Sequence, residues 1–245
     1  MEMGEIVIQN VSQIYHSKTQ GDFHALSNID LRLKKGENLA IEGESGSGKS
    51  TLARLLVGLE KPSAGRILID GENILNWNYG EWKRHRKKIQ AVFQDSSGTL
   101  NPARSAFSNV EEGLINLTDY NRKERKQRIY DLMAAVHMDH KLLHTPVRRL
   151  SGGEQRRLSL LRAIAVEPDY LIMDEVTSGL DLISADAVLT LVENSAKLHL
   201  CSCIFITHSR KDAMRISDRI VIMGEGRIVE QGHLIKHISK QKGLG

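Results

Sequence analysis

The chain has 245 residues, of which 40% are apolar and 26% are charged, and its formal net charge at pH 7 is +4. A chain of this length holds one large domain or two small ones, and it can bury a sizeable core without disulfide or metal staples. The composition is ordinary for a soluble globular protein, and the weakly basic balance selects no class of partner.

Cysteine usage and the N-terminal residues indicate the compartment. Cys201 and Cys203 lie one residue apart in an apolar run, and at this spacing both point to one face of a strand and cannot easily bridge. We expect them to be small core residues in a reducing compartment. The N-terminus has acidic residues where a signal peptide has basic ones, and no window reaches the ~18 apolar residues of a membrane span. We therefore expect a cytosolic protein, which a partner could hold at a membrane.

The first third of the chain alternates between apolar and polar residues, which predicts short strands at 5–11, 27–33 and 66–70. Residues 38–42, NLAIE, form a short apolar strand that runs directly into the glycine-rich loop GESGSGKS. The leucines that follow, within residues 50–60, have helical spacing. This stretch therefore predicts a strand, a loop and a helix in succession, next to a strand-rich N-terminal layer.

The rest of the chain divides into a helical part and an alternating part. The basic run 81–88 precedes the strand-like IQAVF, and residues 105–143 are charged and helical with no β-rich run. A second helix is expected near Ser151. Two apolar strands and a terminal hairpin, whose turn should hold Gly224 and Gly226, are expected at 170–174, 203–207 and 218–232. Buried strands that alternate with helices predict an α/β fold with a mostly parallel sheet covered on both faces.

The glycine-rich loop fits the pattern G-x4-G-K-[ST] at every fixed position, with the strand before it and the helix after it that this pattern requires. Glycines let the backbone approach a phosphate, and N–H groups at a helix N-terminus attract an anion. We expect Lys49 to bridge the β- and γ-phosphates of a nucleotide and the Ser50 hydroxyl to bind Mg²⁺. The expected phosphate-binding residues are Gly43, Glu44, Ser45, Gly46, Ser47, Gly48, Lys49, Ser50 and Thr51.

Further polar residues follow apolar strands. Asp174 and Glu175 follow YLIM; we expect the first to hold Mg²⁺, directly or through water, and the second to act as general base toward the attacking water. His208 follows FIT at another strand end, where ligands bind in α/β sheets, and could contact the γ-phosphate, although a lone histidine there is more often a surface residue. Gln94, after AVF, is an uncharged ligand for Mg²⁺ or for that water.

These motifs occur in an order that resembles the nucleotide-binding subunits of ABC transporters. GESGSGKS, VFQD, LSGGE, LIMDE, SGLD and FITH follow one another as in that family, over residues 5 to about 235. The resemblance implies a P-loop NTPase core with a mostly parallel sheet, an N-terminal antiparallel β layer and an inserted helical subdomain at about 95–165, all within one nucleotide-binding domain, 1–245. It also implies that the nucleotide is ATP and that Mg²⁺ is the cofactor.

The resemblance assigns individual roles as well. Gln94 falls in the Q-loop, Asp181 in the D-loop, and His208 is the switch histidine. Tyr15, in VSQIYHS, matches an aromatic that stacks on adenine, although a tyrosine near a strand end is commonly half-buried packing. In this family two cassettes associate head-to-tail, so the signature of one chain clasps the γ-phosphate of the ATP held by the other. The signature residues here are Ser151, Gly152, Gly153 and Glu154.

Two stretches narrow the branch of the family. TLNPARS, at 99–105, resembles the peptide and nickel import branch, and STLARLLVGLE with VFQDS is most similar to the second ATPase of nickel importers. The resemblance implies a second, different ATPase subunit, two permease subunits and an extracytoplasmic binding protein, with this chain peripheral on the cytoplasmic face of the membrane. Nickel, dipeptides, oligopeptides, a metallophore complex and even an exported substrate stay open as cargo, because the ATPase does not touch the transported species.

Some residues depart from the family pattern. Glu154 stands where the signature usually has Gln, Val176 replaces a common Pro, and Ser209 stands where Asp is usual. The long C-terminal extension of many peptide-import ATPases is missing, which favours nickel over oligopeptides.

Two other classes of function are weighed against transport. A soluble ABC-type ATPase acting on DNA or ribosomes is disfavoured, since there is no second cassette, long insertion or metal-type cysteine cluster. An inactive regulatory cassette is also disfavoured, because it would need Lys49, Glu175 or His208 to be lost, and all three are present. The basic run 81–88 favours a solvated helical face over a nucleic-acid site, so no nucleic-acid partner is expected.

Overall fold

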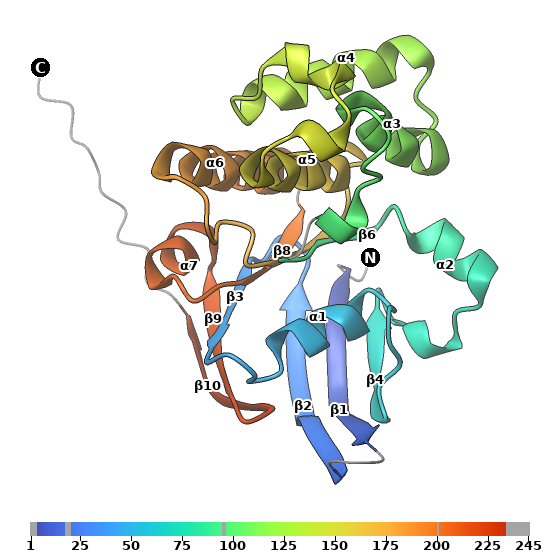
Figure 1. Cartoon of the computed structure of the whole chain (residues 1–245). Coiled ribbons are helices and arrows are strands. Elements are labelled where there is room, and N and C mark those ends of the chain that lie inside the picture. The colour runs from blue at the N-terminus through green and yellow to red at the C-terminus, as the bar shows by residue number, and fades with distance from the viewer. Residues whose placement is uncertain (1–3, 18–20, 95–96, 200, 234–245) are drawn as a thin grey trace, which may run out of the picture.

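The computed structural model describes residues 4–17, 21–94, 97–199 and 201–233. Two β-sheets lie together, and the helices α3 to α6 lie on one side of them, at the top of Figure 1. The strands are β1 Glu5–Ser17, β2 Gly21–Lys34, β3 Leu39–Gly43, β4 Ala64–Ile69, β5 Glu72–Asn73, β6 Ile89–Val92, β7 Tyr170–Asp174, β8 Ser202–Ile206, β9 Arg219–Gly224 and β10 Arg227–His233. The α-helices are α1 Lys49–Leu56, α2 Tyr79–His85, α3 Ala106–Leu117, α4 Arg122–Ala135, α5 Gly152–Ala165, α6 Leu182–His199 and α7 Arg210–Ile216.

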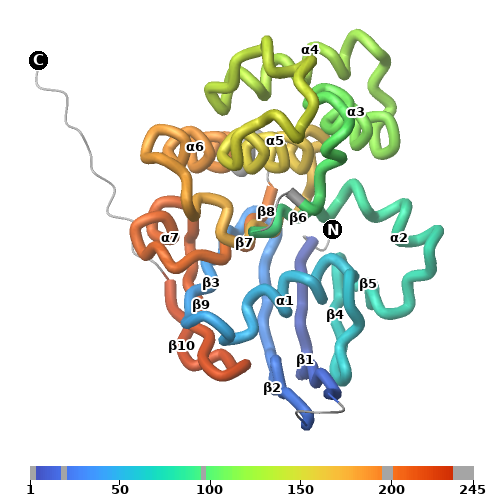
Figure 2. The backbone as a smooth tube through the Cα atoms, viewed as in Figure 1, coloured from blue at the N-terminus to red at the C-terminus, as the bar shows by residue number. Residues whose placement is uncertain are grey.

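The larger sheet has the strand order β10-β9-β3-β8-β7-β6. All its pairings are parallel except that of the edge strand β10 with β9. The early strand β3 therefore lies between two late strands, β8 and β9, as the colours along the tube show in Figure 2. The carboxyl ends of β3, β7 and β8 meet at one edge of the sheet, which is where α/β proteins bind ligands.

Both faces of this sheet are buried, because alternate residues of its strands enter two different cores. Leu171 and Phe205 pack with residues of α3 to α6, whereas Ile172 and Ile204 pack with α1 and the N-terminal strands. The second core also holds the inward face of a smaller antiparallel sheet, ordered β2-β1-β4-β5. The expected α/β fold, with a mostly parallel sheet and an N-terminal antiparallel layer, is confirmed.

Helices occupy the segment between β6 and β7. After a 3-10 turn at Ser97–Thr99, helices α3, α4 and α5 follow one another, with short 3-10 turns before α5. Asparagine and serine side chains start these helices, since Asn121 and Ser151 both form capping boxes with the glutamate three residues later. The helices share one core with the sheet face beneath them.

Three sequence predictions need adjustment. The first strand extends to Ser17, well beyond the expected 5–11, because it pairs with both β2 and β4. The turn of the terminal hairpin consists of Glu225 and Gly226, both with positive φ, whereas Gly224 still belongs to β9. Strand β8 begins at Ser202 and ends at Ile206, one residue earlier at each end than the expected 203–207.

Other expectations hold among the residues described. Cys201 and Cys203 are buried free thiols in the same core. The basic run is largely helical, and its cations Lys83, Arg84 and Lys87 are exposed. No helix in the described ranges combines the length and the hydropathy that a membrane crossing requires.

Candidate active site

The glycine-rich loop joins β3 to α1, and its backbone is pressed between neighbouring strands. Gly48 is the N-cap of α1 and has a φ of +98°, in the region that favours glycine. A Cβ on Gly48 would lie 2.5 Å from the carbonyl oxygen of Ala25, and one on Gly43 would lie 2.2 Å from that of Met223. Glycine is therefore required here by crowding as well as by φ, and the loop has little freedom to take another shape.

This crowding makes a prediction for Gly48→Ala. We expect the substitution to destabilise the protein by about 1–3 kcal/mol and to weaken ATP binding, because the loop must shift to relieve the clash. Thermal denaturation and ATP titration of the purified chain measure both effects. Gly113→Ala is the matched control: Gly113 is helical, and its added Cβ would approach nothing closer than 3.6 Å. Equal behaviour of the two variants would contradict the argument.

Lys49 is almost fully buried inside the loop. Its Nζ donates to the carbonyl oxygens of Gly43 at 2.9 Å and Glu44 at 2.6 Å, and to Ser47 Oγ at 3.2 Å. Burial lowers the pKa of Lys49, an effect that the nearby carboxylates of Glu175 and Asp174 oppose. The loop thus holds its ammonium group at the point where the sequence places phosphates.

Asp174 and Ser50 lie together at the carboxyl end of β7. Asp174 is 3% exposed, and the Ser50 hydroxyl donates a hydrogen bond to its carboxylate. Burial raises the pKa of Asp174, whereas the bond from Ser50 lowers it. A hydroxyl and a carboxylate beside a phosphate-binding loop are the hard oxygen ligands that Mg²⁺ uses together with nucleotide phosphates, so these residues fit the ion.

Two of the predicted residues, Gln94 and His208, lie beside the carboxylate of a third, Glu175. Gln94 Nε2 donates to Glu175 Oε2 at 2.9 Å, and His208 Nδ1 lies 3.6 Å from Glu175 Oε1. Glu175 has a φ of +52°, and its N–H donates to the carbonyl oxygen of Ile206 at 2.9 Å. The backbone thus turns sharply after Asp174, so that Glu175 faces Gln94 and His208. The structure brings together side chains that follow three different strands, β6, β7 and β8.

Tyr15 lies on β1 and is tied to the far end of α1. Its hydroxyl donates to Glu60 Oε2, and Arg54 donates to Glu60 Oε1 at 2.6 Å. Arg54 Nη2 also donates to Thr51 Oγ1 at 3.2 Å, which joins this group to the phosphate-binding loop. Sequence reasoning placed Tyr15 near the nucleotide but did not find Arg54 or Glu60. The charges and the i,i+6 spacing of Arg54 and Glu60 were the only signal available.

The signature residues form the start of α5. The Ser151 hydroxyl donates to Glu154 Oε2 at 2.9 Å, and the Glu154 N–H donates back to Ser151 Oγ at 3.3 Å. A glutamate can serve here in place of glutamine because either side chain completes a capping box. Leu180 of the D-loop segment approaches Gly153, whose added Cβ would lie 3.4 Å from it. Asp181 accepts bonds from the N–H and the hydroxyl of Ser184, both of which lower its pKa.

Ser209 and Val176 are the other two residues that depart from the family pattern, and both have a defined place in the structure. Ser209 caps α7, where its Oγ accepts the N–H of Asp212 at 3.3 Å, a role that aspartate could also fill. Val176 is buried in the core shared with α5 and α6. Arg156, which the sequence did not single out, donates from α5 to the carbonyl oxygen of Gln94 at 3.3 Å. It therefore connects α5 with the segment that follows β6.

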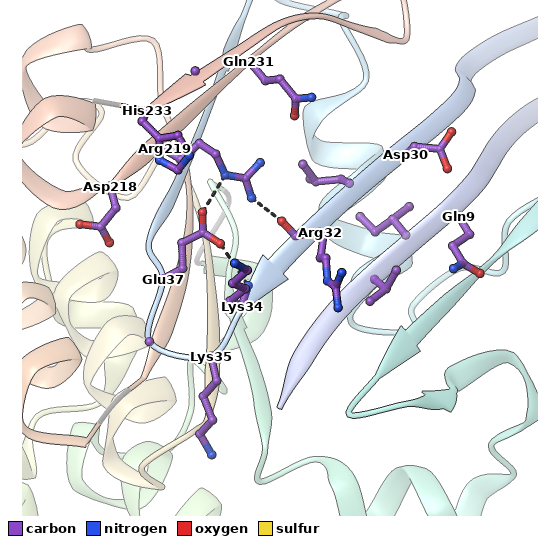
Figure 3. A pocket seen from close by; sticks show the side chains of 15 residues that line it. Gln9, Asp30, Arg32, Lys34, Lys35, Glu37, Asp218, Arg219, Gln231 and His233 are labelled. Carbon is purple, nitrogen blue, oxygen red and sulfur yellow. Dashed lines mark hydrogen bonds and ion pairs between the residues drawn. The ribbon is translucent and has the colours of Figure 1, made fainter. Parts of the chain in front are cut away.

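A groove of about 990 Å³ lies elsewhere in the molecule. Figure 3 shows it between the outer faces of β1 and β2 and the hairpin β9–β10, with Arg219 bound to Glu37 inside it. None of the predicted site residues lines it. The phosphate-binding loop instead lines a second groove, of about 830 Å³, through Glu44, Ser45, Gly46 and Ser47. The groove in Figure 3 is therefore separate from the phosphate-binding loop.

Comparisons with known proteins agree with this geometry. The family model described as ABC transporter matches residues 26–178. The chain belongs to the ABC transporter family. It is 39% identical over 232 residues to a nickel import ATP-binding protein, NikE, of Shigella boydii and 38% identical to that of Escherichia coli K12, covering 92% of this chain and 87% of each relative.

Solved structures extend the comparison to the fold. A dimeric ATP-binding cassette in a post-hydrolysis state with ADP and Pi superposes with a TM-score of 0.87 at 28% identity, covering 94% of this chain and 98% of that one. CbiO1 of Clostridium perfringens, described as part of the ABC transporter complex cbiONQ, gives 0.78 at 30% identity and covers 95% and 89%. The chain is an ABC-type ATPase, and its relatives include nickel import ATP-binding proteins.

Proposed function

We propose that this ABC ATPase drives nickel uptake through partner permeases. The observation that carries the proposal is the convergence of the loop lysine, the Asp174–Ser50 pair and the Gln94–Glu175–His208 group, in a chain 38–39% identical to nickel import ATP-binding proteins. Import of dipeptides, oligopeptides or a metallophore complex by the same branch of the family is the alternative cargo.

The phosphate-binding loop is proposed to hold the triphosphate. N–H groups at the start of α1 point toward the loop, and Lys49 exchanges its loop carbonyl partners for β- and γ-phosphate oxygens. Bound Mg²⁺ would supply charge neutralisation on the phosphates, and Ser50, Asp174 and Gln94 are the side chains proposed to hold it, directly or through water. Tyr15 is proposed to stack on the adenine.

Glu175 is proposed to accept a proton from the attacking water. Its carboxylate is held by Gln94 on one oxygen and lies near His208 on the other, so its orientation is fixed before water arrives. His208 is mostly exposed, with 66% of its side chain accessible, which leaves it free to contact the γ-phosphate. Gln94 is proposed to orient the water and to report on it to the adjoining helical segment through the Arg156 contact.

The signature is proposed to act on the ATP of a partner cassette. Ser151 and Gly152 are exposed at the N-terminus of α5, where N–H groups favour an anion. The arrangement supports a head-to-tail dimer with a second ATPase subunit, with Asp181 near the junction. Two permeases and an extracytoplasmic binding protein complete the proposed importer, which places this chain on the cytoplasmic face of the membrane.

The cargo is tested by uptake in cells. We expect cells carrying Glu175→Gln to lose radioactive nickel uptake, and excess dipeptide should not compete with uptake by the wild type. Dipeptide competition in the wild type, or normal nickel uptake with lost dipeptide uptake in the variant, would replace nickel by peptide as cargo. If neither flux changed, the transport proposal for these cargoes would fail.

A further inference from the structure

The hydroxyl of Tyr15 is held from two sides. It donates to Glu60 Oε2, and it accepts from Arg54 Nη2 at 3.4 Å. Arg54 and Glu60 also bind each other, with Arg54 Nε 2.6 Å from Glu60 Oε1. The three side chains therefore form a closed triangle that joins strand β1 to the end of helix α1. All three are partly buried, so solvent competes only in part for these bonds.

The backbone beneath this triangle is also fixed. Ser63, in the segment that follows Glu60, donates its N–H to the carbonyl oxygen of Ser12 at 2.9 Å and to Gln13 Oε1 at 3.0 Å. The N–H of Ile14 donates to Ser63 Oγ at 3.0 Å. The stretch that carries Glu60 is thus tied to the strand that carries Tyr15, and Glu60 has a defined position from which to hold the hydroxyl.

The triangle continues into the phosphate-binding loop. Arg54 Nη2 donates to Thr51 Oγ1 at 3.2 Å, and Thr51 is the last residue of the predicted phosphate-binding stretch. One arginine therefore contacts the residue proposed to stack on the base and a residue proposed to bind the phosphates. A rigid link of this kind sets the distance and angle between the two ends of a bound nucleotide.

We propose that Glu60 and Arg54 are positioning residues that hold the ring of Tyr15 in the orientation required to stack on adenine. The inference rests on the proposed adenine contact of Tyr15 and adds the residues that make that contact rigid. A free tyrosine side chain rotates about two bonds, and stacking would have to immobilise it at the moment of binding. Anchoring the hydroxyl removes this cost while leaving the ring face available.

The test separates the base from the phosphates. Purified full-length variants are titrated with Mg·ATP and, separately, with Mg·tripolyphosphate, which has no base. Glu60→Ala and Tyr15→Phe should each weaken ATP binding by about 3- to 10-fold and leave tripolyphosphate binding within about twofold of the wild type. Glu60→Gln keeps an acceptor for the hydroxyl and should fall between Glu60→Ala and the wild type.

Two further variants complete the design. Tyr15→Ala should weaken ATP binding most, by about 10- to 100-fold, because it removes the ring itself. Glu112, on α3, pairs with Arg104, which precedes that helix, at 3.4 Å, and both side chains are exposed. Glu112→Ala therefore controls for the loss of an arginine–glutamate pair elsewhere in the molecule. This variant should change neither the ATP affinity nor the tripolyphosphate affinity.

Two results would overturn the inference. If Glu60→Ala weakened ATP and tripolyphosphate binding equally, Glu60 would act only on the phosphates, through Arg54 and Thr51. Unchanged ATP affinity in both Glu60→Ala and Tyr15→Phe would mean that the ring needs no anchor. Failure of the wild type to bind Mg·ATP would be a separate result, since it would remove the nucleotide site itself.

Discussion

Glu175→Gln is expected to lower ATP turnover by about 100- to 10,000-fold while leaving ATP affinity nearly unchanged. An amide has almost the same shape as the carboxylate but cannot accept a proton from water. Gln94 can still donate to its oxygen, so the local geometry should persist. Steady-state hydrolysis and equilibrium ATP binding by the purified chain, alone and with its partner subunits, measure the two effects.

A matched change elsewhere shows whether this effect is specific. Glu193 on α6 pairs with Arg215 at 3.2 Å, and Glu193→Gln should leave turnover within about twofold of the wild type, since both partners lie on α6 and α7 and neither is a predicted site residue. Because ATP binds to the Glu175→Gln variant without being consumed, a closed dimer with the partner cassette should accumulate. Turnover close to that of the wild type would remove Glu175 from the role of general base.

Lys49→Ala is expected to weaken ATP binding by about 10- to 100-fold and to abolish measurable hydrolysis. The ammonium group supplies charge-assisted hydrogen bonds to phosphates, each contributing about 1.5–3 kcal/mol. In the structure that group is buried and bonded to three loop oxygens. Among the loop contacts that the structure describes, no other cation is placed to replace it. Equilibrium titration with Mg·ATP gives the change in affinity.

Lys35→Ala is the control for this substitution. Lys35 lies in the turn after β2 and pairs with Asp169 at 2.8 Å, away from the phosphate-binding loop. The same deletion of a lysine charge there should leave ATP affinity unchanged. If Lys49→Ala bound ATP as tightly as Lys35→Ala, the role given to the loop lysine would be wrong.

The chemistry at the strand ends could be predicted from sequence because it is encoded locally. A glycine pattern between a strand and a helix defines the phosphate-binding loop, and Asp174 and His208 directly follow apolar strands. In a parallel sheet such ends meet at one edge, so the gathering of Glu175, Gln94 and His208 follows from strand type alone. The order of six motifs then identifies the family, although the roles of individual residues stay predictions.

Contacts between distant segments could not be predicted in the same way. Tyr15 and Glu60 lie 45 positions apart, and nothing in either neighbourhood indicates that a strand and the end of a helix will meet. The same is true of Trp82, which packs so closely on Gly58 that a Cβ there would lie 2.0 Å from its ring. These contacts depend on how β1 and α2 each pack near the end of α1, which periodicity does not report.

The central place of β3 has a consequence for how the chain is made. Ile41 is flanked by Ile206 and Val221, which leave the ribosome long after it. During synthesis both edges of the loop-bearing strand stay unpaired after the antiparallel layer and the helices before β7 have left the ribosome. Closing such distant pairings is slow, and open strand edges recruit other chains. The nucleotide site therefore cannot form before β8 and β9 are made, and a nascent chain stalled before β8 would be an aggregation hazard and a substrate for chaperones.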